Sequence, residues 1–267
     1  MKLPIPFLYN DMIIEGVELQ EPSGETVANT KDEATKNSYR GIMEWIVGGV
    51  KEFITDTGGT IDKDIRNIVK KMPVKDAEVL AIYIALEIDS DDGIEGIYEC
   101  PRCHVEMVCE FREGDDTRDH IIKDMAIEYQ QGAEGITIDI DRPVILTQKS
   151  KINGAEAIIE IRKLEFRNPT LEDAVKAWAR YGADQSRAQY ALYVEALEKT
   201  NSETPSQADK ANFGMRIFEK MAASDLRTLA GKMSRYGMRN TIRKKCKCGK
   251  EFDAEVNTAN FFVSSLH

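Results

Sequence analysis

The five cysteines of the chain fall into two groups that lie far apart in the sequence. Cys100 and Cys103 have the two-residue spacing that lets a tight turn direct two thiolates at one metal ion, and Cys246 and Cys248 form a second, shorter turn of this kind. Five sparse cysteines do not fit a disulfide framework, since such frameworks are denser and occur in smaller secreted chains. We therefore expect these four thiolates to hold one structural Zn²⁺, with no open position for a catalytic water.

The single residue between Cys246 and Cys248 makes the second turn tighter than a CxxC turn. For this reason His104 or Cys109 remains an alternative for one of the four ligands. The surrounding charges favour a thiolate site, because cations lower thiolate pKa values and offset the negative charge of the site. The basic residues around the second pair are Arg239, Arg243, Lys244, Lys245, Lys247 and Lys250.

Strands are expected to position both cysteine turns. Residues typical of a β-strand follow each pair, Val105–Phe111 after the first and Phe252–Val256 after the second. Two cysteine turns that each open onto a strand are the layout of a zinc ribbon. If both halves bind one ion, that ion joins the two ends of a long insertion. Closing such a loop costs chain entropy, which the roughly 10–16 kcal/mol contributed by structural zinc in small peptides would offset.

The other elements predict an α+β fold with an N-terminal β-hairpin, two helical blocks and a strand-rich middle that carries the zinc ribbon. The hairpin is predicted from apolar runs at Ile5–Tyr9 and Met12–Gln20, on either side of the turn residues Asn10 and Asp11. The expected regions are residues 1–25 (hairpin), 26–92 (helical), 93–166 (strand-rich, with the first cysteine pair), 167–238 (helical) and 239–267 (second cysteine pair and a C-terminal strand).

More detailed expectations come from the periodicity of apolar residues. Helical spacing continues from Ile42 to Phe53, which predicts one helix that ends at the turn 55–60. A short amphipathic helix is predicted at Thr117–Gln131, and another helix through Tyr190, Val194 and Leu197. The segment Asn201–Ser206 is expected to be a linker.

The composition of the 267 residues is that of a globular, intracellular-type protein: 42% are apolar, 31% are charged, and the net charge is −10. We expect no membrane partner, because no apolar run approaches the roughly 18–20 residues that span a bilayer and no N-terminal signal is visible. We expect no enzyme, because the sequence lacks a Ser-His-Asp order, an HExxH helix and a glycine-rich phosphate loop. Asp56-Thr57-Gly58 matches the aspartic protease tripeptide but is expected to be a turn that ends a helix.

A zinc-ribbon protein that binds nucleic acid is the alternative reading of the function. The basic stretch Arg239–Lys250 lies beside the expected metal, where it would meet phosphates. The net charge of −10 and the lack of interleaved aromatic residues for base stacking argue against this reading.

The beginning of the chain, Leu3–Tyr9 and Val17–Gly24, resembles the start of phage tail assembly chaperones. The layout of CPRC at Cys100–Cys103, CGKEF at Cys248–Phe252 and VNTANFF at Val256–Phe262 resembles the T-even-type baseplate assembly proteins of contractile-tailed phages. The resemblance implies a non-enzymatic protein that helps to build the tail or baseplate hub through contacts with tail or baseplate proteins. It further implies a location in the host cytoplasm. The partner protein, the oligomeric state and retention in the finished virion tail stay open.

Overall fold

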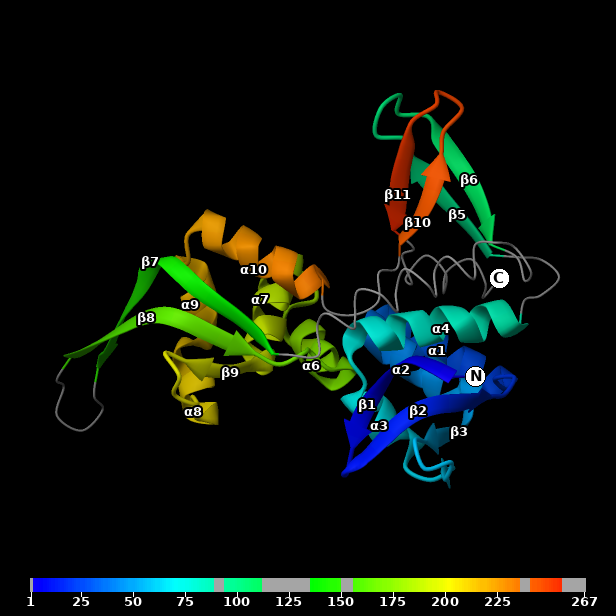
Figure 1. Ribbon diagram of the computed structural model, residues 1–267, viewed down its shortest axis with the longest axis horizontal. Coiled ribbons are helices and arrows are strands. Elements are labelled where there is room, and N and C mark those ends of the chain that lie inside the picture. The colour runs from blue at the N-terminus through cyan, green and yellow to red at the C-terminus, as the bar shows by residue number, and fades with distance from the viewer. Residues whose placement is uncertain (1, 89–93, 112–134, 150–155, 236–240, 256–267) are drawn as a thin grey trace. The chain divides into compact units, whose positions relative to one another are not determined.

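The computed structural model describes residues 2–88, 94–111, 135–149, 156–235 and 241–255. The chain divides into two compact units, a first unit of Met1–Gln131 with Gly237–His267 and a second unit of Gly132–Tyr236. Each unit contains helices and antiparallel strands (Figure 1), which confirms the predicted α+β class. No helix within the described residues is long and apolar enough to cross a membrane.

The predicted N-terminal hairpin is present and belongs to a larger sheet. Its strands pair around a two-residue turn at Asn10 and Asp11, whose φ angles of 48° and 63° suit the right-handed twist of a hairpin. The second strand also pairs with a third, so the four-stranded antiparallel sheet follows chain order. These strands are β1 (Lys2–Tyr9), β2 (Met12–Leu19), β3 (Val50–Thr55) and β4 (Thr60–Ile61).

Three of the four described helices of the first unit supply buried apolar residues to its core, and the first helix packs against the second. Trp45 lies in the core, and its indole Nε1 donates a hydrogen bond to the carbonyl oxygen of Ala81 at 3.0 Å. Gly41 allows close helix packing, because a Cβ atom there would lie 2.6 Å from the Cβ of Ala34. The helices are α1 (Gly24–Lys36), α2 (Ser38–Gly49), α3 (Ile65–Lys71) and α4 (Val74–Ile88).

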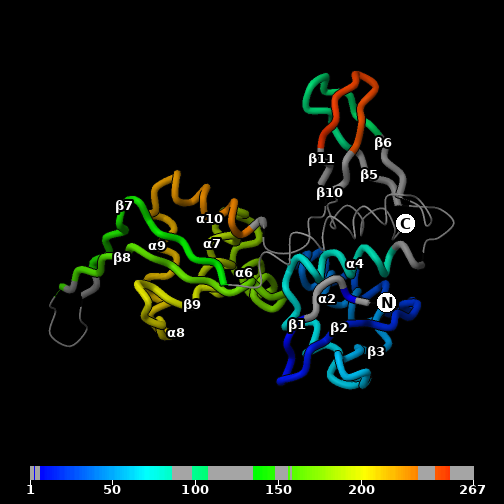
Figure 2. Tube along the Cα trace, in the orientation of Figure 1, coloured from blue at the N-terminus to red at the C-terminus, as the bar shows by residue number. Residues whose placement is uncertain are grey.

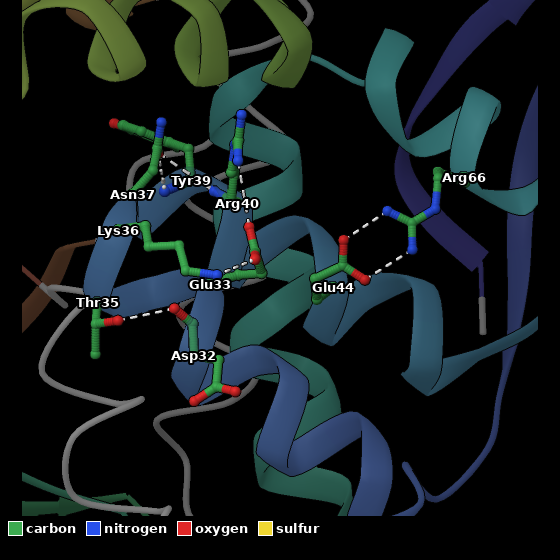
Figure 3. Close-up of polar contacts among 9 residues, drawn as sticks. All are labelled: Asp32, Glu33, Thr35, Lys36, Asn37, Tyr39, Arg40, Glu44 and Arg66. Carbon is green, nitrogen blue, oxygen red and sulfur yellow. Dashed lines mark hydrogen bonds and ion pairs between the residues drawn. The ribbon is translucent and has the colours of Figure 1, made fainter.

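Side-chain contacts tie these helices together (Figure 3). The side chain of Asn37 caps α2 by accepting hydrogen bonds from the backbone N–H groups of Tyr39 and Arg40. The guanidinium of Arg66 on α3 binds both carboxylate oxygens of Glu44 on α2, at 2.5 and 2.7 Å. Such a two-pronged pair fixes orientation more strongly than a single ion pair.

The prediction of one helix from Ile42 to Phe53 is wrong. Helix α2 ends at Gly49, and the following residues form strand β3. Two glycines interrupt the helix there, and the β-branched residues after them favour a strand that pairs with β2. Asp56 consequently follows a strand rather than a helix, and the turn predicted at this position connects β3 to β4.

The second unit packs helices against a three-stranded antiparallel sheet in the order β7-β8-β9. Aromatic rings fill the core, where Phe218 lies 5.7 Å from Tyr193 and 6.3 Å from Phe166, measured between ring centroids. The strands are β7 (Ile136–Lys149), β8 (Glu156–Phe166) and β9 (Leu197–Thr200). The helices are α6 (Leu171–Tyr181), α7 (Gln185–Ala196), α8 (Gln207–Asp209), the π-helix η1 (Lys210–Gly214), α9 (Met215–Lys220) and α10 (Ala223–Arg235).

Two predictions in this unit need correction. The helix predicted through Leu197 ends at Ala196, and Leu197 begins strand β9, which was not predicted. The expected linker begins with a tight turn in which Asn201 and Ser202 have positive φ angles. The Oδ1 atom of Asn201 accepts backbone hydrogen bonds from β8 at Arg162, so the turn is held against the sheet. The helix predicted at Thr117–Gln131 lies outside the described residues.

Candidate metal centre

Two antiparallel hairpins carry the cysteine turns. The first pairs β5 (Ile94–Glu99) with β6 (Glu106–Phe111), and the second pairs β10 (Thr241–Lys245) with β11 (Glu251–Glu255). Figure 1 shows the hairpins side by side with their turns at the same end. The strands after the cysteines were predicted, whereas β5 and β10 were not, because their short, charged sequences lack a clear apolar alternation. A cysteine turn at the tip of a hairpin needs a strand on both sides, and this requirement would have located β5 and β10.

The two turns share one backbone pattern although they differ in length. In the first, the N–H of His104 donates to the carbonyl oxygen of Cys100 at 2.9 Å; in the second, the N–H of Gly249 donates to Cys246 at 2.8 Å. The residue after the second cysteine is left-handed in both turns, with φ of 57° at His104 and 83° at Gly249. The CxC turn therefore keeps the geometry of the CxxC turn with one residue fewer.

The four predicted ligands converge. The Sγ atoms of Cys100, Cys103, Cys246 and Cys248 all lie within 4.8 Å of one another. Two pairs across the hairpins are shorter, Cys100 to Cys248 at 3.7 Å and Cys103 to Cys246 at 3.6 Å. A tetrahedral site with metal–sulfur bonds of about 2.3 Å has sulfur–sulfur edges of about 3.8 Å. These two distances match the edges of a tetrahedral metal site, and both pairs are too far apart for disulfide bonds.

The alternative ligand His104 is turned to another partner. Its side chain is exposed, and its Nδ1 atom lies 2.5 Å from a carboxylate oxygen of Glu99. Cys109 lies within strand β6, opposite Gly96 and three residues beyond the strand's first residue. At about 3.3 Å per residue this backbone position is about 10 Å along the strand from Glu106. The Sγ atoms of the four cysteines come within 4.8 Å of one another and supply four ligands without either alternative.

Without a metal ion, the pKa values of Cys100 and Cys103 differ strongly. Desolvation raises the pKa of Cys100, but backbone N–H groups of Cys103 and Arg102 and neighbouring thiols outweigh it and lower this pKa to about 6. A backbone hydrogen bond from Val105 lowers the pKa of Cys103, yet desolvation and the side chains of the other three cysteines raise it to about 12. The lowered pKa of Cys100 favours its thiolate, which is the form of cysteine that binds a metal ion.

The two hairpins carry net charges of opposite sign. The first hairpin, 94–111, contains four glutamates and one arginine, whereas the second, 241–255, contains five basic and three acidic residues. Four thiolates around a divalent ion carry a charge of about −2. The exposed side chains of Lys245, Lys247 and Lys250 offset this charge from the second hairpin. The opposite charge balance of the hairpins therefore supports the pairing that the cysteines make.

Each hairpin contributes one buried and one exposed cysteine. Cys100 and Cys246, the first cysteine of each turn, are 0% and 4% exposed, while Cys103 and Cys248 are exposed at the outside of the turns. Four sulfur ligands leave no coordination position for water or substrate, so an ion bound here holds structure.

Comparison with protein-family models, with curated proteins and with solved structures finds no match to this chain.

Proposed function

We propose that the cluster binds one structural Zn²⁺ that clips together the two hairpins, which flank residues 132–236 in the sequence. The observation that carries this proposal is the set of four Sγ atoms within 4.8 Å of one another, contributed by residues more than 140 positions apart. A tetrahedral set of four sulfur ligands suits zinc, and it also suits iron. Elemental analysis of purified protein should find about one zinc per chain; iron in its place would replace zinc in the proposal, and a folded, metal-free protein would refute it.

The function we propose is that of a non-enzymatic assembly factor, or minor component, of a phage tail or baseplate that acts through protein–protein contacts. The resemblance at Leu3–Gly24 and at the cysteine turns supports it, and so does a metal site that is saturated with protein ligands. The N-terminal hairpin offers an exposed apolar contact. Leu8 and Ile13 lie directly opposite each other beside its tight turn, and they are 67% and 42% exposed.

A pull-down of the tagged full chain from phage-producing cells tests this function. Tail or baseplate proteins identified by mass spectrometry would support it, and recovery of polymerase components or nucleic acid would refute it. The double variant Leu8→Ser/Ile13→Ser should recover these proteins at least tenfold less than the wild type. Ile158→Ser is the control, because that side chain is 74% exposed on the second unit and lies on a different hairpin.

Nucleic-acid binding is the second candidate, and the exposed basic residues at the metal turns favour it. Arg102, Lys245, Lys247 and Lys250 are exposed around the four cysteines. Binding through these residues would weaken steeply with salt, because phosphate contacts release counterions. Fluorescence anisotropy with labelled single and double strands at 50 and 200 mM salt tests it. Absence of salt-sensitive binding, or equal binding by Lys245→Gln/Lys247→Gln, would remove this candidate.

A further inference from the structure

Within the part of the chain that the structure describes, β7 is an edge strand, and its free edge can be identified from contacts on the far side of β8. The carbonyl oxygens of Glu160 and Lys163 on β8 accept hydrogen bonds from Asn201, at 2.6 and 2.9 Å, and so face β9. Their partners on β7 are Ile145 and Asp139. In an antiparallel pair, residues that do not bond each other direct both backbone groups away from the partner strand. The backbone groups of Ile145 and of residues two positions away along the strand therefore face the open edge.

Three basic side chains each donate to one backbone carbonyl oxygen of this edge. Lys220 Nζ donates to Ile145 at 3.1 Å, Arg216 to Thr147 at 3.4 Å, and Lys232 Nζ to Thr137 at 2.8 Å. The donors come from α9 and α10, which lie along β7 (Figure 2). These acceptors are the outward-facing residues identified above, because Thr147 lies two positions from Ile145 and Thr137 lies two positions from Asp139. The row of contacts follows the edge of the strand and does not join the two faces of the sheet.

The strand itself has a second feature that discourages pairing. Its register with β8 shifts between Asp139 and Val144, and Pro143 lies in this irregular stretch. Proteins protect open strand edges with irregularities, prolines and charged side chains, because a long regular edge accepts another strand. After the irregularity, the regular stretch from Val144 to Lys149 (VILTQK) has high β propensity and no acidic residue.

We propose that Arg216, Lys220 and Lys232 guard the edge of β7 against antiparallel pairing with β7 of a second copy of this chain. The occupant is a second copy because a two-fold axis would place the same VILTQK stretch opposite itself, without acidic repulsion. Ile145 and Ile158 lie diagonally on the exposed face, are 46% and 74% exposed, and would pack against their counterparts. The guarding cations compete for the carbonyl oxygens, and in a dimer the two rows of cations would also repel each other.

Substitution of all three guards by an uncharged side chain of similar length tests the proposal. The full chain with Arg216→Met/Lys220→Met/Lys232→Met should self-associate with a dissociation constant at least tenfold lower than that of the wild type, measured by sedimentation velocity. The control is Lys176→Met/Arg180→Met/Arg187→Met, which removes the same charge from α6 and α7, where these side chains pair with carboxylates and leave β7 untouched. Equal association of the two triple variants would overturn the proposal.

A fourth substitution distinguishes strand pairing from non-specific association. Thr147→Pro removes an N–H group that faces the open edge, so it should return the guard variant to wild-type association while the pairing with β8 persists. Association that survives this change would overturn the proposal. If the triple variant loses its near-ultraviolet circular dichroism, Lys220→Met alone replaces it. A smaller but measurable rise in association is then expected, and no rise over Lys176→Met overturns the proposal.

Discussion

The Sγ atom of Cys103 lies 3.6 Å from that of Cys246, although 143 positions separate the two residues in the sequence. Within the described residues, the two hairpins that carry them form separate two-stranded sheets with no shared backbone ladder. Side-chain contacts at the cysteines, and the ion that we propose there, therefore hold the hairpins together. The stability of this junction should depend on metal far more than the stability of the second unit, which has its own apolar core.

Metal removal should accordingly loosen the junction selectively. Chelation at neutral pH is expected to speed amide hydrogen exchange in 94–111 and 241–255 by at least tenfold and to leave 156–166 unchanged. Cys246→Ser should reproduce this effect and lose the metal, since three sulfur ligands no longer close the tetrahedron. Cys109→Ser serves as the control and should keep both metal and protection. Equal loss in the two variants would show that the ligand set is different.

The left-handed residues of the two turns make a second prediction. Gly249 has a φ of 83°, so Gly249→Ala should destabilise the second turn by about 1 kcal/mol and weaken metal binding. His104 adopts φ of 57° with a side chain, so His104→Gly should preserve metal binding and relieve the strain of its turn. Competition titration with a chromophoric chelator measures both affinities. Weaker binding by His104→Gly than by Gly249→Ala would assign His104 a ligand role instead.

The cysteine cluster could be predicted from the sequence because it depends on a local spacing rule. The spacing of Cys100 and Cys103 predicts one turn, and that of Cys246 and Cys248 predicts another, whatever sequence separates the two pairs. The meeting of the two turns was inferred from the chemistry of zinc, which needs four ligands, and the structure brings the sulfur atoms together. The backbone roles of His104 and Gly249 were missed, because a positive φ at a histidine leaves no mark in the sequence.

Elements whose apolar residues fit two periods could not be assigned from the sequence. Phe53 follows Gly49 and Ile46 at helical spacing, yet it also alternates on a strand with its neighbours, and pairing with β2 decides the outcome. Strand β9 is only four residues long and continues directly from α7, so Leu197 fits the helical stripe of the residues before it. Tertiary pairing overrides local propensity in both cases.

An ion pair in the second unit predicts acid sensitivity. Burial raises the pKa of Asp173, but hydrogen bonds from Arg167 and Thr170 outweigh it and lower this pKa below its ordinary value. The carboxylate thus contributes stability above the unfolded pKa of about 3.9, and this contribution is lost as pH falls through the lower folded pKa. Asp173→Asn should cost about 1–3 kcal/mol at pH 7 and less below pH 4. Urea unfolding at both pH values measures this, and a constant difference would contradict it.

Asp76 on α4 predicts the opposite dependence on pH. The residue is 7% exposed, and neither carboxylate oxygen has a hydrogen-bond partner among the described residues. Burial and the nearby Glu78 raise the pKa of Asp76 well above its ordinary value. As pH rises above the unfolded value of about 3.9, the unfolded chain loses this proton before the folded chain does, so stability falls.

Asp76→Asn replaces the titrating carboxyl with a neutral amide and should therefore remove this loss of stability. We expect the variant to be more stable than the wild type by about 1–3 kcal/mol at pH 7, and the difference to shrink toward pH 4. Asp76 lies in the first turn of α4, but a protonated carboxyl gains little from the positive end of the helix dipole. Asp32→Asn on the exposed face of α1 changes the charge equally and should have little effect. A loss of stability in Asp76→Asn at pH 7 would show that the carboxylate is ionised and paired in the folded protein.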